Sequence, residues 1–423
     1  MTAPASLRID NARLLDPASG RDAIGSLRVV DGRIAALGEL TPGPNAERVV
    51  DARGRALLPG LIDLSVRLPD DSAASRAVLQ AALRAGVTSL VLPAWHGATA
   101  LTDAATLPAA RALGAPGLPR VFACGLLHDG ESRRADPAAL ARAGALSGAL
   151  DPALPRDARV LRWLMQDAAQ AGLPLWVRPH DPRFGAGVVA AGAYATRLGL
   201  SGVPLAAETQ AVQLLLALQR ETGARLHLTR LSSEAAVTLV RQARADGLSV
   251  TCDVSIQHLH LTELDIGFYD AHCHLRPPLR GQRDRAALAQ GLADGTIAAL
   301  CSDHAVLGPD DKIAPFAETA PGAAGVGLLF SLACKWALDS RLPLSRALAC
   351  VTSGPAAVAG LAAGRLQVGA PADLCLADLD AEWFASPDAL GAVNAATPFA
   401  GMMLPGRVCA AWVGGDPAWE SPF

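Results

Sequence analysis

The sequence has few aromatic residues, little net charge and no apolar run long enough to span a membrane. Only 4% of its 423 residues are aromatic, and the formal net charge is −3. This balance gives no basic field that would attract nucleic acid or an anionic membrane surface, so we expect neither as a partner. The first residues also lack the basic-then-apolar order of a signal peptide. We therefore expect a cytoplasmic protein.

Closely spaced cysteines are absent as well. The eight cysteines lie far apart in the chain, and no Cys-x-x-Cys pair occurs among them. Such spacing indicates neither a disulfide framework nor a common structural zinc site. We expect reduced, buried thiols. With 51% hydrophobic residues, the chain is long enough for one large core and a smaller appended domain.

Both ends of the chain show short alternating strands separated by turns. Near the N-terminus, Val30 and Arg33 flank Asp31-Gly32, a dipeptide that tolerates the positive φ of a tight hairpin. Similar strand-and-turn patterns return at 364–378 and 406–415. Because chain ends often lie close together, we expect one small β-sandwich domain built from residues 1–57 and 361–423.

The middle of the chain alternates apolar runs, many of them β-branched, with helical stretches. The runs are 61–62, 87–92, 121–122, 175–177, 226–228, 250–251 and 297–300. Predicted helices such as Asp157–Ala171 and Ser233–Asp246 separate them, which is typical of parallel βα units. We therefore expect an α/β fold with a (β/α)8 barrel over residues 58–360. An active site on this fold lies at the carboxyl ends of the strands.

Several segments, taken together, resemble the dihydroorotase family of cyclic amidohydrolases. In order along the chain, they are Leu58–Leu64, Leu226–Ser233, Gly247–Val254, Arg276–Arg280, Ser302–Ala305, Ala320–Gly322, Pro371–Leu374 and Thr397–Gly401. Each segment alone is a weak signal, whereas the ordered set covers nearly the whole chain and is specific. The resemblance implies a site for one or two Zn²⁺ ions that activate a water molecule.

The resemblance also indicates where the zinc ligands would stand, and those positions carry other residues here. The family's His-x-His after the first barrel strand matches Ser65 and Arg67. The histidines that end strands five and six match Arg178 and Arg230, while the aspartate that ends strand eight matches Asp303. The bridging carboxylate of the family falls around 150–152.

Arginine cannot replace histidine as a metal ligand. A guanidinium stays protonated at working pH and has no lone pair to donate. At about 4 Å and an effective dielectric near 20, it would repel a divalent ion by roughly 8 kcal/mol, or about six decades of affinity. We therefore predict no zinc cofactor and no catalytic residues. Instead, we expect Asp303 to form salt bridges with Arg67, Arg178 and Arg230.

The residues that bind the substrate in the family are also missing from the matching positions of this chain. The family has an arginine for the substrate carboxylate after its His-x-His, where this chain reads Leu68–Asp71. A second family histidine follows the strand-eight aspartate, where this chain reads His304–Leu307. These losses favour a chain that does not catalyse the family's reaction.

Other polar residues leave less favoured interpretations open. The pairs His258/His260 and His272/His274 could form a relocated metal site if each lay on a strand, where alternation places both members on one face. An Asp303–His304 dyad is disfavoured, because adjacent strand residues face opposite ways. We interpret the remaining candidates as ordinary loop or surface groups; they are His180, Asp181, Arg276, Arg280 and Lys312.

The resemblance extends to a non-catalytic subclass. In several bacteria, dihydroorotase-like chains without the metal ligands accompany the aspartate transcarbamoylase catalytic chain. The Ser-x-Arg replacement of His-x-His resembles that subclass, which implies a structural subunit of pyrimidine biosynthesis in a hetero-oligomer with that chain. The alternative is an active cyclic amidohydrolase whose site is rebuilt around Asp303, with His180, His258 and His304.

Overall fold

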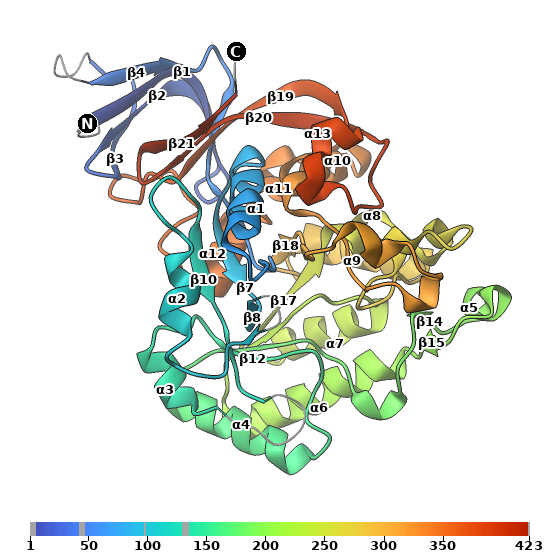
Figure 1. The fold of residues 1–423 in the computed structure, drawn as a ribbon. Helices are drawn as coiled ribbons and strands as arrows, with labels where there is room; N and C mark the ends of the chain where they lie inside the picture. The colour runs from blue at the N-terminus through green and yellow to red at the C-terminus, as the bar shows by residue number, and fades with distance from the viewer. Residues whose placement is uncertain (1–5, 42–46, 97–98, 129–134, 422–423) are drawn as a thin grey trace.

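The two ends of the chain form one sheet, which lies at the top of Figure 1. The computed structural model describes residues 6–41, 47–96, 99–128 and 135–421. The strands of this sheet are β1 (Ser6–Asp16), β2 (Arg21–Val30), β3 (Arg33–Gly38), β4 (Arg48–Asp51), β5 (Ala56–Pro59), β19 (Leu374–Phe384), β20 (Met403–Val413) and β21 (Asp416–Glu420). Their order is β21-β20-β19-β5-β1-β2-β3, and β4 also pairs with β1. The N- and C-terminal segments meet where β5 pairs with β19.

This sheet folds around its own apolar core and forms the predicted β-sandwich domain. Ile9, Leu27 and Ile34 from the N-terminal strands are buried in one cluster with Leu376 and Trp412 from the C-terminal strands. The predicted hairpin between β2 and β3 is confirmed, since Asp31 and Gly32 adopt φ values of 49° and 75° between the two strands. Both ends of the chain are therefore needed to complete this core.

The middle of the chain forms the predicted barrel of parallel strands. These strands are β6 (Leu61–Asp63), β7 (Val87–Leu92), β10 (Arg120–Ala123) with β11 (Gly125–Leu126), β12 (Gly148–Leu150), β13 (Leu175–Val177), β16 (Leu226–Leu228), β17 (Val250–Ser255) and β18 (Ala299–Cys301). Each pairs in parallel with its neighbour, and β10 and β11 together supply the third strand of the barrel. The fourth strand, β12, was absent from the predicted runs.

The barrel closes between its last and first strands through a neighbouring loop. The backbone N–H of Leu300 in β18 donates to Cys350, and that of Ile62 in β6 donates to Val351. Beyond the strand ends, the backbone N–H of Ser302 donates to a side-chain oxygen of Asp63 at 3.0 Å. The residues that follow β6 and β18 are thereby held next to each other.

Helices surround the barrel (Figure 1). They are α1 (Ser72–Arg84), α2 (Leu107–Ala112), α3 (Pro137–Arg142), α4 (Ala158–Gln170), α6 (Ala206–Thr222), α7 (Glu234–Ala245), α9 (Gln282–Asp294), α10 (Leu329–Asp339), α11 (Leu344–Ala349) and α12 (Ser353–Ala359). The two named helix predictions are confirmed by their caps: Asp157 accepts from the N–H of Arg159 at the start of α4, and Ser233 from that of Ala236 at the start of α7.

Shorter elements decorate the barrel. These are β8 (Trp95–His96), β9 (Thr99–Ala100), β14 (Val189–Ala190), β15 (Gly202–Val203), α5 (Ala193–Leu198), α8 (Ile256–His260) and α13 (Pro387–Asn394), with 3-10 turns η1 (Pro182–Phe184), η2 (Glu263–Ile266), η3 (Ala271–Cys273), η4 (Pro309–Lys312), η5 (Phe316–Glu318) and η6 (Val326–Leu328). Figure 1 shows β14, β15 and α5 projecting beyond the barrel. Among the described residues, no helix is both long and apolar enough to cross a membrane.

The cysteines lie inside the protein, as predicted. All eight are buried and form no disulfide. Burial raises the pKa of most of their thiols, for example that of Cys124 to about 12. These side chains therefore act as small apolar groups in the core.

Candidate site at the barrel mouth

The residues at the family's ligand positions converge at the carboxyl ends of the barrel strands. Ser65 and Arg67 follow β6, Arg178 follows β13, Arg230 follows β16 and Asp303 follows β18. The structure brings all five into one ion-paired cluster, which also contains Asp151 at the end of β12. We call these six residues the arginine–aspartate network.

Asp151 is the centre of this network. One carboxylate oxygen accepts a hydrogen bond from Arg178 at 3.1 Å, and the other accepts one from Arg230 at 2.8 Å and lies 4.0 Å from Arg67. Val177 and Leu150 are partners in neighbouring strands, so the next residue of each strand, Arg178 and Asp151, meet side by side. Geometry of the sheet, rather than a loop, sets this contact.

Asp303 has a smaller role than the sequence predicts. Its carboxylate accepts from Arg230 at 3.1 Å and from the hydroxyl of Ser65 at 3.1 Å. The salt bridge to Arg230 is confirmed, whereas the expected pairing with Arg67 and Arg178 is wrong, because those side chains turn to Asp151. Asp303 lies beyond the end of β18 and its side chain is 19% exposed, compared with 8% for Asp151.

The charges of the network stabilise each other. Burial alone would raise the pKa of Asp151, but Arg230, Arg178 and Arg67 outweigh it and lower the pKa to about 2. Burial lowers the pKa of Arg178 to about 10, although Asp151 opposes this shift. The pKa of Arg230 is raised because Asp151 and Asp303 outweigh its desolvation. Asp151, Arg178 and Arg230 are therefore ionised at neutral pH.

A second set of contacts orients Arg230. The backbone N–H of Arg230 donates to Asp253 at 2.7 Å, and the other oxygen of Asp253 contacts the His227 ring at 2.9 Å. The second ring nitrogen of His227 contacts Thr251 at 2.8 Å. Arg230 has a left-handed φ of 56°, which this contact to Asp253 holds in place. Sequence reasoning missed both residues: His227 lies in the predicted run 226–228, and Asp253 lies beyond the predicted run 250–251, in the part of β17 that the sequence did not predict.

The network does not fit zinc. Three of the family's imidazole positions carry guanidiniums, which cannot coordinate a metal, and two of these, Arg178 and Arg230, already occupy both oxygens of Asp151. The hydroxyl of Ser65 is committed to Asp303. Within the described parts of the chain, no group of three or more His, Cys, Asp or Glu side chains is arranged to hold a metal ion.

The two additional His-x-His pairs do not lie on strands. His258 and His260 belong to α8, which begins after Ser255, a capping residue that accepts from the N–H of His258. His258 contacts the carbonyl of Pro277, whereas His260 contacts that of Leu332. Each imidazole therefore has its own structural partner, and the less favoured interpretation, which required both histidines on one strand, does not hold for this pair.

The second pair is likewise split. His272 and His274 flank the end of η3, where His272 contacts Asp270 at 2.9 Å and His274 contacts the hydroxyl of Thr319 at 2.9 Å. The interpretation of both as non-ligand side chains agrees with these separate contacts.

The Asp303–His304 pair forms no dyad, although not for the predicted reason. Both residues follow the end of β18, and Asp303 has a φ of 44°, so strand alternation does not apply. A ring nitrogen of His304 accepts from the N–H of Gly325 at 3.2 Å, while Asp303 turns to the network. Burial lowers the pKa of His304 to about 4.

Two residues expected at the surface are inside. Arg280 is buried, donates to the hydroxyl of Ser232 at 2.8 Å and lies 3.9 Å from Glu208. Lys312 is partly buried and donates to the backbone carbonyls of Ala271 and Ala320. These contacts give both residues a role in holding the loops over the barrel mouth.

The other loop residues divide. Asp181 is buried and caps η1 by accepting from the N–H of Arg183. His180 is partly exposed, and burial together with Arg178 lowers its pKa to about 4. Arg276 is exposed, as expected, but it lies at the mouth of the barrel.

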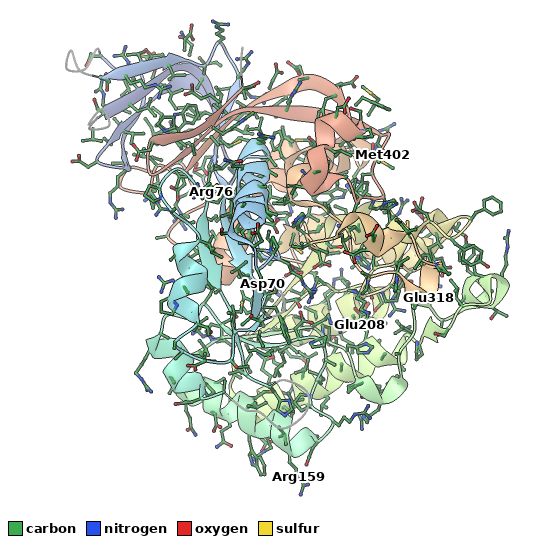
Figure 2. The ribbon with its side chains drawn as sticks, viewed as in Figure 1. Asp70, Arg76, Arg159, Glu208, Glu318 and Met402 are labelled. Atoms are coloured by element: carbon green, nitrogen blue, oxygen red, sulfur yellow. The ribbon has the colours of Figure 1, made fainter. Side chains whose placement is uncertain are left out.

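Two adjoining cavities of about 310 and 330 Å³ open over the network. The first contains Arg67, Trp95, Asp151 and Asp303 in its wall, and the second contains Arg156, His180, Glu208 and Arg280. Both share Pro152, Arg178, Arg230 and Arg276. Figure 2 labels Glu208, a residue of α6, near the middle of the molecule, and Arg159, in the first turn of α4, at its lower edge.

A barrel of this kind with a terminal β-sandwich is the architecture of the amidohydrolases. The model of the amidohydrolase family matches residues 206–418. Among solved structures, an L-hydantoinase (dihydropyrimidinase) from Arthrobacter aurescens superposes with a TM-score of 0.86 at 23% identity, covering 98% of this chain and 96% of that one. A D-hydantoinase from a Thermus species superposes with a TM-score of 0.83 at 19% identity, covering 98% and 96%.

Sequence relatives define the family further. A dihydroorotase of Anaeromyxobacter sp. strain K is 36% identical, over 97% of this chain and 96% of the relative. A dihydroorotase-like protein of Pseudomonas aeruginosa is also 36% identical, over 95% and 97%, and one of Pseudomonas putida is 35% identical, over 95% and 96%. The chain belongs to the dihydroorotase family of amidohydrolases.

Proposed function

We propose that this chain is a non-catalytic member of the dihydroorotase family that serves as a structural subunit. The observation that carries this proposal is the arginine–aspartate network in the place of a zinc centre. Its guanidiniums repel a divalent cation and occupy the carboxylates that would otherwise bind one. Overall identity does not decide the question, since relatives named dihydroorotase and dihydroorotase-like protein are equally similar to this chain.

The partner we propose is the aspartate transcarbamoylase catalytic chain, within a hetero-oligomer of pyrimidine biosynthesis. This choice comes from the resemblance of the Ser65-x-Arg67 motif to a non-catalytic subclass. An exposed apolar segment supports association in general. Leu264 and Phe268 are largely or fully exposed, and Tyr269 is partly exposed beside them. Exposed apolar groups close together often mark a protein–protein contact.

The first test concerns chemistry. Purified protein supplemented with Zn²⁺ should bind no stoichiometric metal and should convert neither dihydroorotate nor carbamoyl aspartate, because the donor set is cationic. Metal analysis and a turnover assay measure the two expectations. Zinc-dependent turnover that Asp303→Ala abolishes would contradict the proposal.

The second test concerns association. Co-expression with the aspartate transcarbamoylase catalytic chain of the same host should give a complex that elutes from size exclusion as one species larger than either component. Transcarbamoylase activity or thermal stability should fall when this chain is omitted. Separate elution at micromolar concentration with unchanged transcarbamoylase activity would overturn the proposed partner.

The alternative of a rebuilt hydrolytic site receives less support from the geometry. Asp303 lines the first cavity and His180 lines the second. His258 and His304 line neither and are held by Pro277 and Gly325. The four side chains therefore do not face one common space in which a substrate could contact them all.

A further inference from the structure

The walls of the two adjoining cavities carry an excess of positive charge. Among the described residues, these walls contain three carboxylates, those of Asp151, Glu208 and Asp303, and six arginines, at positions 67, 156, 178, 230, 276 and 280. The chain as a whole has a formal net charge of −3, so this excess is a local feature of the barrel mouth. Charge of one sign focused in a concave site attracts ions of the opposite sign.

The arginines differ in how well they are paired. Arg178 and Arg230 are bound to Asp151, and Arg280 lies beside Glu208. In the described part of the chain, Arg156 and Arg276 have no carboxylate oxygen within 4.0 Å. Arg67 reaches only the outer limit of an ion pair, 4.0 Å from Asp151. Three guanidiniums are thus available to an anion.

Arg276 is the common element of the two cavities. Its exposed side chain lines both of them, with Arg67 in the wall of one and Arg156 in the wall of the other. Its positive charge helps to lower the pKa of Arg178 and that of His180, after burial. A positive potential therefore extends across the space that the cavities share.

We propose that the two adjoining cavities together bind a small organic or inorganic dianion. Arg276, which lines both cavities, contacts the negative groups of this ligand, and Arg67 or Arg156 provides a second contact. A guanidinium offers paired N–H donors that match the geometry of carboxylate and phosphate oxygens. Two negative charges would balance most of the local excess. Each cavity, at about 310–330 Å³, has the size of a small-molecule site.

This inference does not depend on the structural-subunit role. A chain that fails to associate with a transcarbamoylase would still carry the cationic cavities, and a chain that does associate could bind the dianion in the complex. Inorganic phosphate and succinate are the probes, because they carry the same chemistry from two sources. Acetate at matched ionic strength serves as the monoanion control.

Titration calorimetry and thermal melting measure the binding. Saturable heat and a rising melting temperature with phosphate, succinate or both support the proposal. The probe with the higher affinity shows whether the site prefers a phosphate or a dicarboxylate. Arg276→Gln should weaken the affinity at least tenfold, the loss expected for a charge-assisted contact. Because Arg276 has no carboxylate partner among the residues that the structure describes, this variant should melt like the parent without ligand.

The matched control is Arg159→Gln. It removes the same charge from an exposed side chain on the outside of α4, whose partner is Asp157 (Figure 2). Its affinity for either probe should equal that of the parent. Arg67→Gln provides a second variant within the site. The proposal is overturned if neither probe gives saturable binding, if acetate binds as well, or if Arg276→Gln and Arg159→Gln behave alike.

Discussion

At the scale of single residues, one carboxylate carries most of the charge compensation at the barrel mouth. Asp151 is buried and faces three guanidiniums, whereas Asp303 faces one guanidinium and one hydroxyl. Removing a buried partner leaves the opposite charges uncompensated, and this cost exceeds the value of the pair itself. The two aspartates should therefore respond differently to substitution.

We predict that Asp151→Ala lowers the free energy of unfolding by about 3–5 kcal/mol, the range for breaking a buried ion pair. Asp303→Ala should cost clearly less, since its side chain is more exposed and its single arginine partner keeps Asp151. Urea denaturation of both variants measures the difference. Glu318→Gln, an exposed carboxylate labelled in Figure 2, is the control and should leave stability unchanged. Equal losses for the two aspartates would contradict a network centred on Asp151.

A second buried carboxylate makes stability depend on pH. Burial raises the pKa of Asp63 to about 7, although N–H groups of Ser302 and Ser65 oppose this shift. A group whose pKa is raised on folding contributes stability at low pH and loses that contribution as pH rises through its folded value. The stability contribution of Asp63 is thus complete below about pH 4, the pKa of the unfolded chain, and is lost as pH rises to about 7, the pKa of the folded protein.

We predict that Asp63→Asn is more stable than the parent at pH 8, by at most about 4 kcal/mol from the size of the shift. The asparagine oxygen can accept the same two N–H groups without a charge. Thermal melting at pH 5 and pH 8 measures the effect, and the advantage of the variant should be smaller at pH 5. An advantage that does not change with pH would show that Asp63 is ionised throughout this range.

At the scale of elements, the closure of the barrel between β18 and β6 depends on the close packing of α12 against the start of β18. Its glycine, Gly354, lies so near β18 that an added Cβ would be 2.1 Å from the backbone oxygen of Ala298. The loop just before α12 carries Cys350 and Val351, the acceptors that link β18 to β6. A side chain at this glycine would therefore displace α12 and disturb the hydrogen bonds of Cys350 and Val351 that close the barrel.

We predict that Gly354→Ala destabilises the protein by about 1–3 kcal/mol, the usual cost of overpacking. Gly192→Ala is the matched control, because its backbone is extended and a Cβ there would have no atom within 4 Å. Chemical denaturation should separate the two variants. Similar stability of both would mean that the α12 contact yields without strain.

The elements also explain which parts of the protein could be predicted from sequence. The barrel and sandwich followed from apolar runs and from the ordered family segments. β12 was missed because two of its three residues are glycine and alanine, so Gly148–Leu150 shows no distinct apolar run. The spacing of His258 and His260 is compatible with a strand, but Ser255 caps a helix there, and the spacing alone does not reveal this cap.

The positions of the site were predictable, but its pairing was not. An ordered family match locates Ser65, Arg67, Arg178, Arg230 and Asp303, and the structure brings them together. Which carboxylate receives the arginines depends on which strands are neighbours and on their register. That β12 lies beside β13, with Leu150 opposite Val177, is a property of the folded sheet.

At the scale of the whole molecule, association should depend on the projecting segment rather than on the barrel mouth. Phe268 is fully exposed in the loop that follows η2. This loop is fixed to the projecting α5 region by hydrogen bonds from Tyr269 to Leu198 and from Tyr194 to Gly267. A fixed, exposed aromatic side chain is a suitable anchor for a partner.

If the proposed transcarbamoylase partner binds, we predict that Phe268→Ser weakens this association at least tenfold and leaves the melting temperature of the isolated chain unchanged. Ile24→Ser, which removes an exposed apolar side chain from the β-sandwich domain, is the control and should bind like the parent. Analytical ultracentrifugation of the mixtures measures both. Equal binding of the three proteins would place the interface elsewhere.

The join between β5 and β19 has a consequence for the synthesis of this protein. Leu57 of β5 pairs with Leu376 of β19, so the first strands leave the ribosome long before their neighbour is made. Until then β5 keeps an unpaired edge, the kind of surface that recruits other strands. A chain whose translation stops within the barrel residues therefore has a sheet with an unpaired β5 edge, which chaperones and proteases can reach. The pairing of β5 with β19 therefore cannot form before translation has passed residue 374.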